Sequence, residues 1–100
     1  MVKHIILWQL KDELTAEEKT EVKKGIKEGL EGLAGKIPGL TEIKVQTEGL
    51  ASSNAEVMLY SVMESAEALK VYADHPAHME VAIGKVRPFF KTRLCLDYEC

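Results

Sequence analysis

The stretch VMLYSVM, residues 57–63, is apolar at both its odd and its even positions. Because successive side chains of a β-strand point to opposite faces of the sheet, this run predicts a strand that is covered on both faces. Residues 3–10, KHIILWQL, have the same character. We expect these two runs to form the central pair of strands in one sheet.

The segment between the two runs predicts a long amphipathic helix. Thr15 and Glu18 form a capping box, whose side chains satisfy free N–H groups at a helix start. Apolar residues then recur at helical spacing up to the break at Pro38-Gly39, namely Val22, Ile26, Leu30, Leu33 and Ile37. Three glycines flank this stripe, which indicates either close approach to a neighbouring element or a gap that lines a cavity: Gly25, Gly29 and Gly32.

The rest of the chain predicts two more strands and two short helices. Residues 40–47 indicate an outer strand with one polar face. Ser65 caps a short helix that ends at Asp74, and Pro76 begins another that extends to about Val86. Residues 92–99 form the last strand, in which two sets of side chains alternate: Leu94, Leu96 and Tyr98 against Arg93, Cys95 and Asp97.

The predicted order β-α-β-β-α-α-β is that of a split βαβ, or ferredoxin-like, α+β fold. We expect residues 1–100 to form a single domain with one four-stranded antiparallel sheet and helices on one face. The other face of that sheet carries Ile5, Leu7 and alternate residues of 57–63. An exposed apolar patch of this kind favours a homodimer in which two sheets pack face to face.

Composition excludes several classes of protein. Of the 100 residues, 46% are hydrophobic and 29% are charged, which is typical of a globular domain. A net charge of −3 argues against a nucleic-acid partner, and no apolar run approaches the length of a membrane span. We therefore expect a cytoplasmic protein. Cys95 and Cys100 are too far apart along a strand to bridge, so we expect reduced thiols with Cys95 partly buried.

Histidines are the main candidates for chemistry. His4 opens the first strand, and His75 and His78 flank the start of the last helix. If this helix covers the face that carries His4, then His4 and His78 approach across one small apolar space, with Tyr72 projecting toward it. Burial lowers the pKa of an imidazole below its usual value of about 6.5, which keeps a neutral base available for proton abstraction.

Each candidate also has a structural interpretation. His75, directly before a proline, is explained as a helix cap, and His78 as a half-buried histidine that bonds to the backbone. Tyr72 and Trp8 are explained as core residues by their periodicity. A zinc site at His75 and His78 is disfavoured because the proline turn separates the two rings and Asp74 is the only nearby carboxylate.

Several motifs resemble the stress-responsive dimeric α/β-barrel family (Dabb). They are VKHIIL at residues 2–7, the segment 11–14 before a capped helix, IPGL at 37–40 and above all YADHPAH at 72–78. The resemblance covers essentially the whole chain. It implies a ferredoxin-like protomer and a homodimer whose sheets form a barrel.

The resemblance also implies a site. Olivetolic acid cyclase, a member of this family, folds a linear polyketide by an intramolecular aldol condensation without a cofactor. By similarity, His78 is the general base, Tyr72 orients or polarises the substrate, and His4 lines the same pocket. The expected ligand pocket further contains Ile6, Trp8, Ile26, Leu30, Val57, Leu59 and His75.

Two departures from the cyclase change the expected substrate. The cyclase has a tyrosine where this chain has Ile26 and a histidine where it has Val57, so we do not expect the same polyketide to bind. Some plant members resemble metal binders through backbone carbonyls, which implies magnesium near residues 35–40. No other cofactor or metal is expected.

We therefore expect a homodimer that binds a small hydrophobic or carbonyl-bearing ligand in an apolar pocket of histidine and tyrosine. If the protein is an enzyme, its chemistry is cofactor-free proton transfer next to a carbonyl. Two alternatives stay open: a non-enzymatic structural stress protein, and a cofactor-free monooxygenase-like enzyme.

Overall fold

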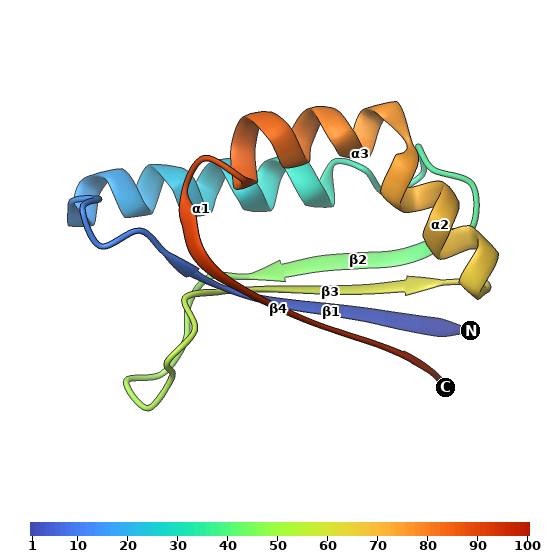
Figure 1. Ribbon diagram of the computed structural model, residues 1–100, viewed down its shortest axis with the longest axis horizontal. Helices are drawn as coiled ribbons and strands as arrows, with labels where there is room; N and C mark the ends of the chain where they lie inside the picture. Colours follow the sequence, from blue (N-terminus) through green and yellow to red (C-terminus); the bar gives the residue numbers. More distant parts are fainter.

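The fold is a four-stranded antiparallel sheet with helices on one face (Figure 1). The computed structural model describes residues 1–100. In chain order the elements are β1 (Val2–Leu10), α1 (Ala16–Glu31), β2 (Leu40–Gln46), β3 (Val57–Met63), α2 (Ala66–Asp74), α3 (Pro76–Val81), the π-helix η1 (Ala82–Val86) and β4 (Phe90–Glu99). The strand order β2-β3-β1-β4 places the two apolar runs at the centre and confirms the predicted ferredoxin-like fold.

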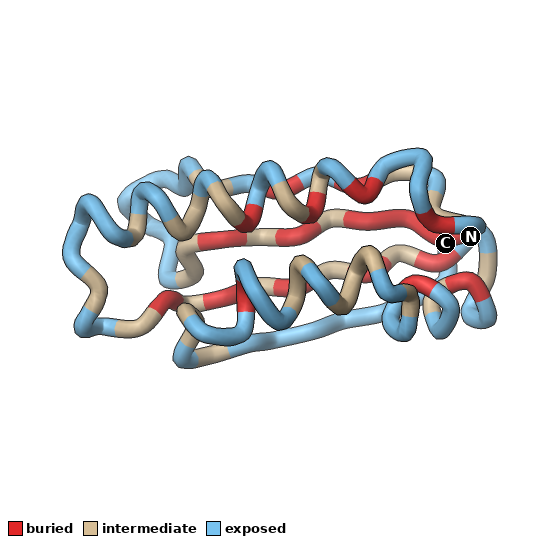
Figure 2. Tube along the Cα trace, turned by 90° about the horizontal axis from the view of Figure 1, so that it is seen from above, coloured by how far each residue is buried: buried red, intermediate tan, exposed pale blue.

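The core lies between the sheet and the helices. Along β1 every second side chain, beginning with Val2, is buried, so one face of the strand packs beneath the helices. Ile26 and Leu30 of α1 are 0% and 2% exposed against this face. Figure 2, seen from above, shows buried segments along the central strands and on parts of the helices that lie over them. The predicted apolar stripe of α1 therefore supplies the upper half of the core.

The helix α1 ends earlier than its apolar stripe suggested. It stops at Glu31, and the expectation of a helix that reaches Ile37 is wrong. Gly32 caps the helix through an N–H that donates to the carbonyl of Glu28, and Gly35 adopts the left-handed backbone region at φ 77°. Ile37 is nevertheless buried, because the turns that follow the helix keep it over the sheet.

Close packing explains the glycine at the centre of α1. A Cβ on Gly29 would lie 2.8 Å from Cγ1 of Val81 on α3, so a larger residue would force the side chain of Val81 or the helices to shift. This confirms the first of the two interpretations of the glycine pattern. Gly25, Gly29 and Gly32 also line a groove on the outer side of the helix pair, so part of the second interpretation holds as well.

The face of the sheet opposite the helices is bare and apolar. In Figure 1 every helix lies on one side, and nothing covers the other. Leu94 and Leu96 of β4 are each 64% exposed there, opposite Leu7 and Ile5 of β1 in the register. No helix in the chain has both the length and the apolarity that crossing a bilayer requires.

Strand β4 is an edge strand that is exposed along most of its length (Figure 2). Only β1 pairs with it, and no strand lies on its other side. Cys95 is consequently exposed, and the expectation that this thiol is partly buried is wrong. Both cysteines are free, as predicted.

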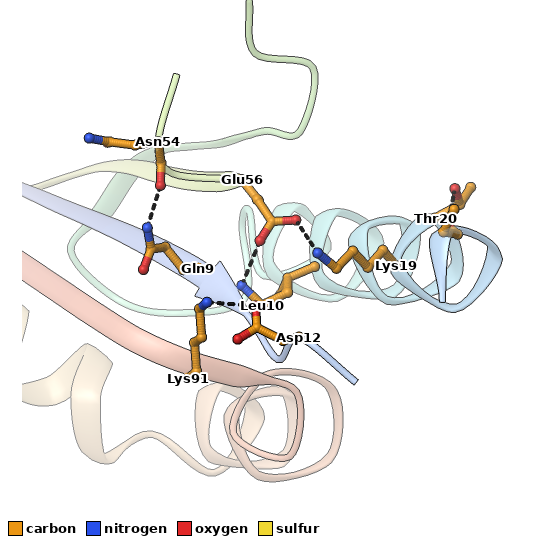
Figure 3. Close-up of polar contacts among 9 residues, drawn as sticks. Gln9, Leu10, Asp12, Lys19, Thr20, Asn54, Glu56 and Lys91 are labelled. Carbon is orange, nitrogen blue, oxygen red and sulfur yellow. Dashed lines mark hydrogen bonds and ion pairs between the residues drawn. The ribbon is translucent and has the colours of Figure 1, made fainter. Parts of the chain in front are cut away.

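A network of hydrogen bonds and ion pairs holds the carboxyl end of β1 (Figure 3). One carboxylate oxygen of Glu56 accepts from the backbone N–H of Leu10 at 3.0 Å, and the other lies 3.1 Å from Nζ of Lys19. The side-chain amide of Gln9 donates to the carbonyl of Asn54 at 2.5 Å. These contacts tie the end of the strand to α1 and to the segment before β3.

Candidate functional site

Three aromatic rings from three elements lie in a row beneath the helices. His4 comes from β1, Tyr72 from α2 and His78 from α3. The ring centroids of Tyr72 and His78 are 4.3 Å apart, and those of His4 and Tyr72 are 5.9 Å apart. The structure thus brings together the three predicted catalytic residues, with Tyr72 in contact with both histidines.

The position of the proton on His78 follows from its backbone contact. Nδ1 lies 3.1 Å from the carbonyl oxygen of Ala73, which can only accept, so Nδ1 carries the proton. Burial lowers the pKa of His78, although the bond to Ala73 opposes this effect. The neutral ring therefore dominates near neutral pH, with Nε2 free as a base.

His4 and Tyr72 have well-defined surroundings. Nδ1 of His4 donates to a carboxylate oxygen of Asp97, the residue opposite it on β4. Tyr72 is only 1% exposed, and burial raises the pKa of its hydroxyl, which therefore stays protonated. That hydroxyl has no hydrogen-bond partner. A buried unpaired hydroxyl costs about 1–3 kcal/mol, so its retention calls for an explanation.

A cavity of about 410 Å³ opens beside His78. Ile6 and Trp8 of β1 and Leu59 of β3 line it from the sheet, and Leu30 lines it from α1. The size is within the usual range for small-molecule sites, about 300–1,000 Å³. The indole N–H of Trp8 is buried and has no partner. Five predicted pocket residues thus line one cavity: Ile6, Trp8, Leu30, Leu59 and His78.

The other predicted pocket residues lie elsewhere, and their assignment to the cavity wall needs correction. Ile26 and Val57 are core residues, 0% and 1% exposed. His75 is the N-cap of α3, where Nδ1 accepts from the N–H of Ala77 at 3.1 Å. This matches the structural interpretation of His75. His4 and Tyr72 adjoin His78 but do not line the cavity.

Sequence reasoning missed the other half of the cavity wall. It consists of Ala82, Val86, Arg87, Phe90 and Arg93. The π-turn η1 brings the first three into place, because the N–H of Arg87 bonds back to the carbonyl of Ala82 at 2.9 Å. The expected α-helix through Val86 gave no sign of this turn. For Arg93 the alternation of the last strand was a usable signal, since it placed this residue on the side of His4.

The sheet register also gathers one set of metal-ligating side chains. Ligand atoms of His4, Cys95 and Asp97 lie within 4.8 Å of one another. Nitrogen, sulfur and oxygen donors suit a borderline ion such as Zn²⁺. However, Nδ1 of His4 already donates its proton to Asp97, so this set is a hydrogen-bonded pair beside a thiol.

The segment expected to hold magnesium does not fit that ion. The carbonyls of Ile37 and Gly39 accept hydrogen bonds from the N–H groups of Leu40 and Glu64. Residues 35–40 contain no carboxylate to balance a divalent charge, and Lys36 adds a positive one.

A larger hollow of about 1020 Å³ lies on the outside, between α1 and the pair formed by α3 and η1. It carries no histidine or tyrosine, and most of its polar residues are charged: Glu17, Glu18, Glu21, Glu28, Glu80, Lys36 and Lys85. We place the candidate site in the smaller cavity, because only there does a neutral imidazole meet an apolar wall.

The fold and the cavity define a class: ferredoxin-like protomers with a small site between sheet and helices. Residues 2–100 match the family described as the stress responsive A/B barrel domain, Dabb, and the chain belongs to this family. A search of curated proteins finds no match.

Several solved structures are similar over nearly the whole chain. A dimeric protein of unknown function with a ferredoxin-like fold from Bacteroides fragilis is 33% identical, with 99% of this chain and 95% of that one covered and a TM-score of 0.92. A protein from Arabidopsis thaliana is 26% identical, with 100% and 95% covered and a TM-score of 0.74. A hydroxynitrile lyase from Passiflora edulis is 18% identical, with 97% and 90% covered and a TM-score of 0.71. The last likeness shows the fold alone.

Proposed function

We propose that this protein binds a small hydrophobic, carbonyl-bearing ligand in the cavity and transfers a proton at the carbon next to the carbonyl, without a cofactor. One observation carries the proposal: a cavity-lining imidazole, His78, is held neutral with its protonated nitrogen engaged by the backbone and its other nitrogen free.

His78 is the proposed base. Abstraction of a proton next to a carbonyl needs a neutral base with its lone pair directed at the ligand, in a site that excludes water. The bond to Ala73 holds the ring in one tautomer. Apolar side chains make up most of the cavity wall, which supports the exclusion of water.

Tyr72 and His4 are the proposed positioning residues. Tyr72 packs against the ring of His78, and His4 packs against Tyr72 while bonded to Asp97. Neither lines the cavity, so we assign them to holding the base rather than to contact with the ligand. The hydrogen-bond donors on the cavity wall that a ligand oxygen can reach are then the guanidinium groups of Arg87 and Arg93.

Deuterium exchange tests the proposed chemistry. The protein is incubated in heavy water with acetylnaphthalene, an aryl methyl ketone, and loss of the methyl proton signal is followed by NMR. We expect the protein to accelerate exchange, and His78→Gln to lower the rate by about 100-fold or more, a typical contribution of a general base. Glutamine can still donate to the carbonyl of Ala73.

His75 offers a matched control on the same helix. Asparagine is a good N-cap, so His75→Asn removes an imidazole without removing the cap, and its exchange rate should equal that of the native protein. Native-like exchange in His78→Gln would contradict the proposal. If His78→Ala instead lowers the melting temperature by several degrees and ligand binding is unaltered, the histidine is structural and the non-enzymatic alternative holds.

We further propose that two copies pack through the bare face of the sheet. Leu94 and Leu96 are 64% exposed and Tyr98 is 42% exposed, beside the half-buried Ile5 and Leu7. An exposed apolar surface of this kind is unusual on a monomer. The B. fragilis protein at 33% identity is described as dimeric, which supports the same assembly here.

Light scattering coupled to size exclusion tests the dimer. Native protein should elute with twice the mass of one chain, and the double variant L94K/L96K should elute as a monomer. Val71, 47% exposed on α2, provides the control, because Val71→Lys adds a charge to an exposed apolar site away from the sheet. A monomeric native protein at micromolar concentration would refute the homodimer.

A further inference from the structure

The polar groups that line the cavity are nearly all hydrogen-bond donors. Arg87 and Arg93, both solvent-exposed, contribute guanidinium groups. Neither of these side chains can accept a hydrogen bond. The single acceptor among the polar lining groups is Nε2 of His78. A ligand that replaces the water around the two guanidinium groups must therefore bring acceptors.

Neither arginine has a carboxylate partner in the protein. The ion pairs of the chain use Lys19, Lys27, Lys44 and Lys91, and the carboxylate of Asp97 bonds to His4. The chain as a whole carries a net charge of −3, whereas Arg87 and Arg93 place two positive charges without carboxylate partners at the mouth of one cavity. Arginine is suited to planar, bidentate contact with a carboxylate.

Backbone geometry holds both arginines on the cavity side. Arg87 follows the π-turn, where its N–H bonds to Ala82, and Pro88 comes directly after it. Arg93 lies opposite Trp8 in the register of β1 and β4. Leu94, its neighbour, points to the bare face, so the proposed dimer contact leaves Arg93 on the side of the cavity.

We propose that the ligand of this cavity is a carboxylate with a flat apolar body, whose anionic group binds Arg87 and Arg93 while its ring lies against Trp8. This inference rests on the proposed function, because it assumes that the cavity binds a ligand, and it adds the class of ligand.

A pair of isosteric probes tests the charge requirement. Naphthoate and naphthamide have the same shape, but only naphthoate is an anion at neutral pH. Trp8 is the only tryptophan, so the proton–nitrogen NMR correlation spectrum contains a single indole signal that reports on the cavity. We expect naphthoate to shift this signal at concentrations about tenfold or more below those of naphthamide.

Variants assign the effect to the two arginines. R87Q and R93Q should each weaken naphthoate binding about tenfold and leave naphthamide unchanged, because each removes one charge-assisted contact. Lys24→Gln is the matched control: it removes one positive charge from an exposed site on α1 outside the cavity and should leave both affinities unchanged. Higher salt should weaken naphthoate binding selectively.

The outcomes separate this inference from the proposed function. Equal affinity for the two probes, or loss of naphthoate binding in Lys24→Gln as large as in R87Q, would overturn the carboxylate subsite and leave an apolar ligand site. If neither probe moves the indole signal, the cavity does not bind such ligands, and both proposals fall. Naphthoate binding without any ketone exchange would support the subsite and overturn the chemistry.

Discussion

Strand β1 has a polar cluster near each end, and the two differ in how fully their groups are satisfied. At the Leu10 end the carboxylate of Glu56 bonds to the backbone of Leu10 and to Lys19, and Lys91 pairs with Asp12 (Figure 3). At the other end, around the row of rings, the hydroxyl of Tyr72 is buried without a partner. The first cluster stabilises the fold, and the second leaves a buried group unsatisfied.

The difference in hydrogen bonding between the two ends of β1 affects the stability of the fold. A net hydrogen bond contributes only about 1 kcal/mol, whereas a buried unpaired group costs about 1–3 kcal/mol. The buried hydroxyl of Tyr72 therefore lowers stability by an amount that packing elsewhere must offset. Strained or unsatisfied positions of this kind are expected where a protein binds or reacts. The comparison predicts that substitutions at the two ends affect stability in opposite directions.

The largest effect on stability is expected from Glu56→Ala. It leaves the N–H of Leu10 without its acceptor and Lys19 without its partner, and bonds to charged groups contribute about 1.5–3 kcal/mol. Urea unfolding measures the change. Glu56→Gln keeps an acceptor for Leu10 and should lose less. Equal losses in both variants would show that the ion pair, and not the bond to Leu10, provides the stability.

Tyr72→Phe should raise the stability of the protein, by a smaller amount than Glu56→Ala lowers it. It removes a buried hydroxyl without a partner and keeps the ring that contacts His78, so the free energy of unfolding should rise by up to about 1 kcal/mol. Ketone exchange should stay within a few-fold of the native rate, with an unchanged pH profile. A large loss of exchange would instead mean that the hydroxyl contacts the ligand.

A change of pH should affect the stability of the ring end through His78. Its pKa is lowered by burial, so the unfolded chain takes up a proton at His78 near pH 6.5, before the folded chain does. The stability that comes from the neutral ring is present above about pH 6.5 and is lost as the pH falls through the folded pKa. The stability difference between the native protein and His78→Gln should therefore shrink on acidification. A difference that is constant with pH would contradict the burial of His78.

The smallest effect is expected from Lys91→Gln. The pair between Lys91 and Asp12 lies at the surface, with the Asp12 side chain 80% exposed, and such pairs add little to stability. We expect no measurable change in the melting temperature. A clear decrease would mean that this pair acts together with the bonds of Glu56, as one network.

Much of the fold was predictable because it rests on local patterns. The two-faced runs at residues 3–10 and 57–63 identified the central strands, and the capping box at Thr15 identified the start of α1. The end of α1 was not predictable from the stripe, because Ile37 is equally apolar in a turn and in a helix. Gly32 and Gly35, with their backbone conformations, decide where the helix stops.

The site was only partly predictable. The motif at residues 72–78 identified Tyr72 and His78, and the alternation of β1 placed His4 on the same side of the sheet. The two arginines were missed because Arg87 and Arg93 belong to no motif and lie on the two sides of the break before β4. Their common position depends on the π-turn and on the pairing of β4 with β1.

The sequence alone determined the period of each element, the bare apolar face of the sheet and the histidines as candidates for chemistry. These are properties of neighbouring residues, and side-chain alternation or helical spacing is enough to recognise them. Only the tertiary structure decided that Tyr72 contacts both histidines, that Trp8, Arg87 and Arg93 line one cavity, and which buried groups lack a partner. Whether a polar group is paired depends on residues far away in the chain, and no local pattern records them.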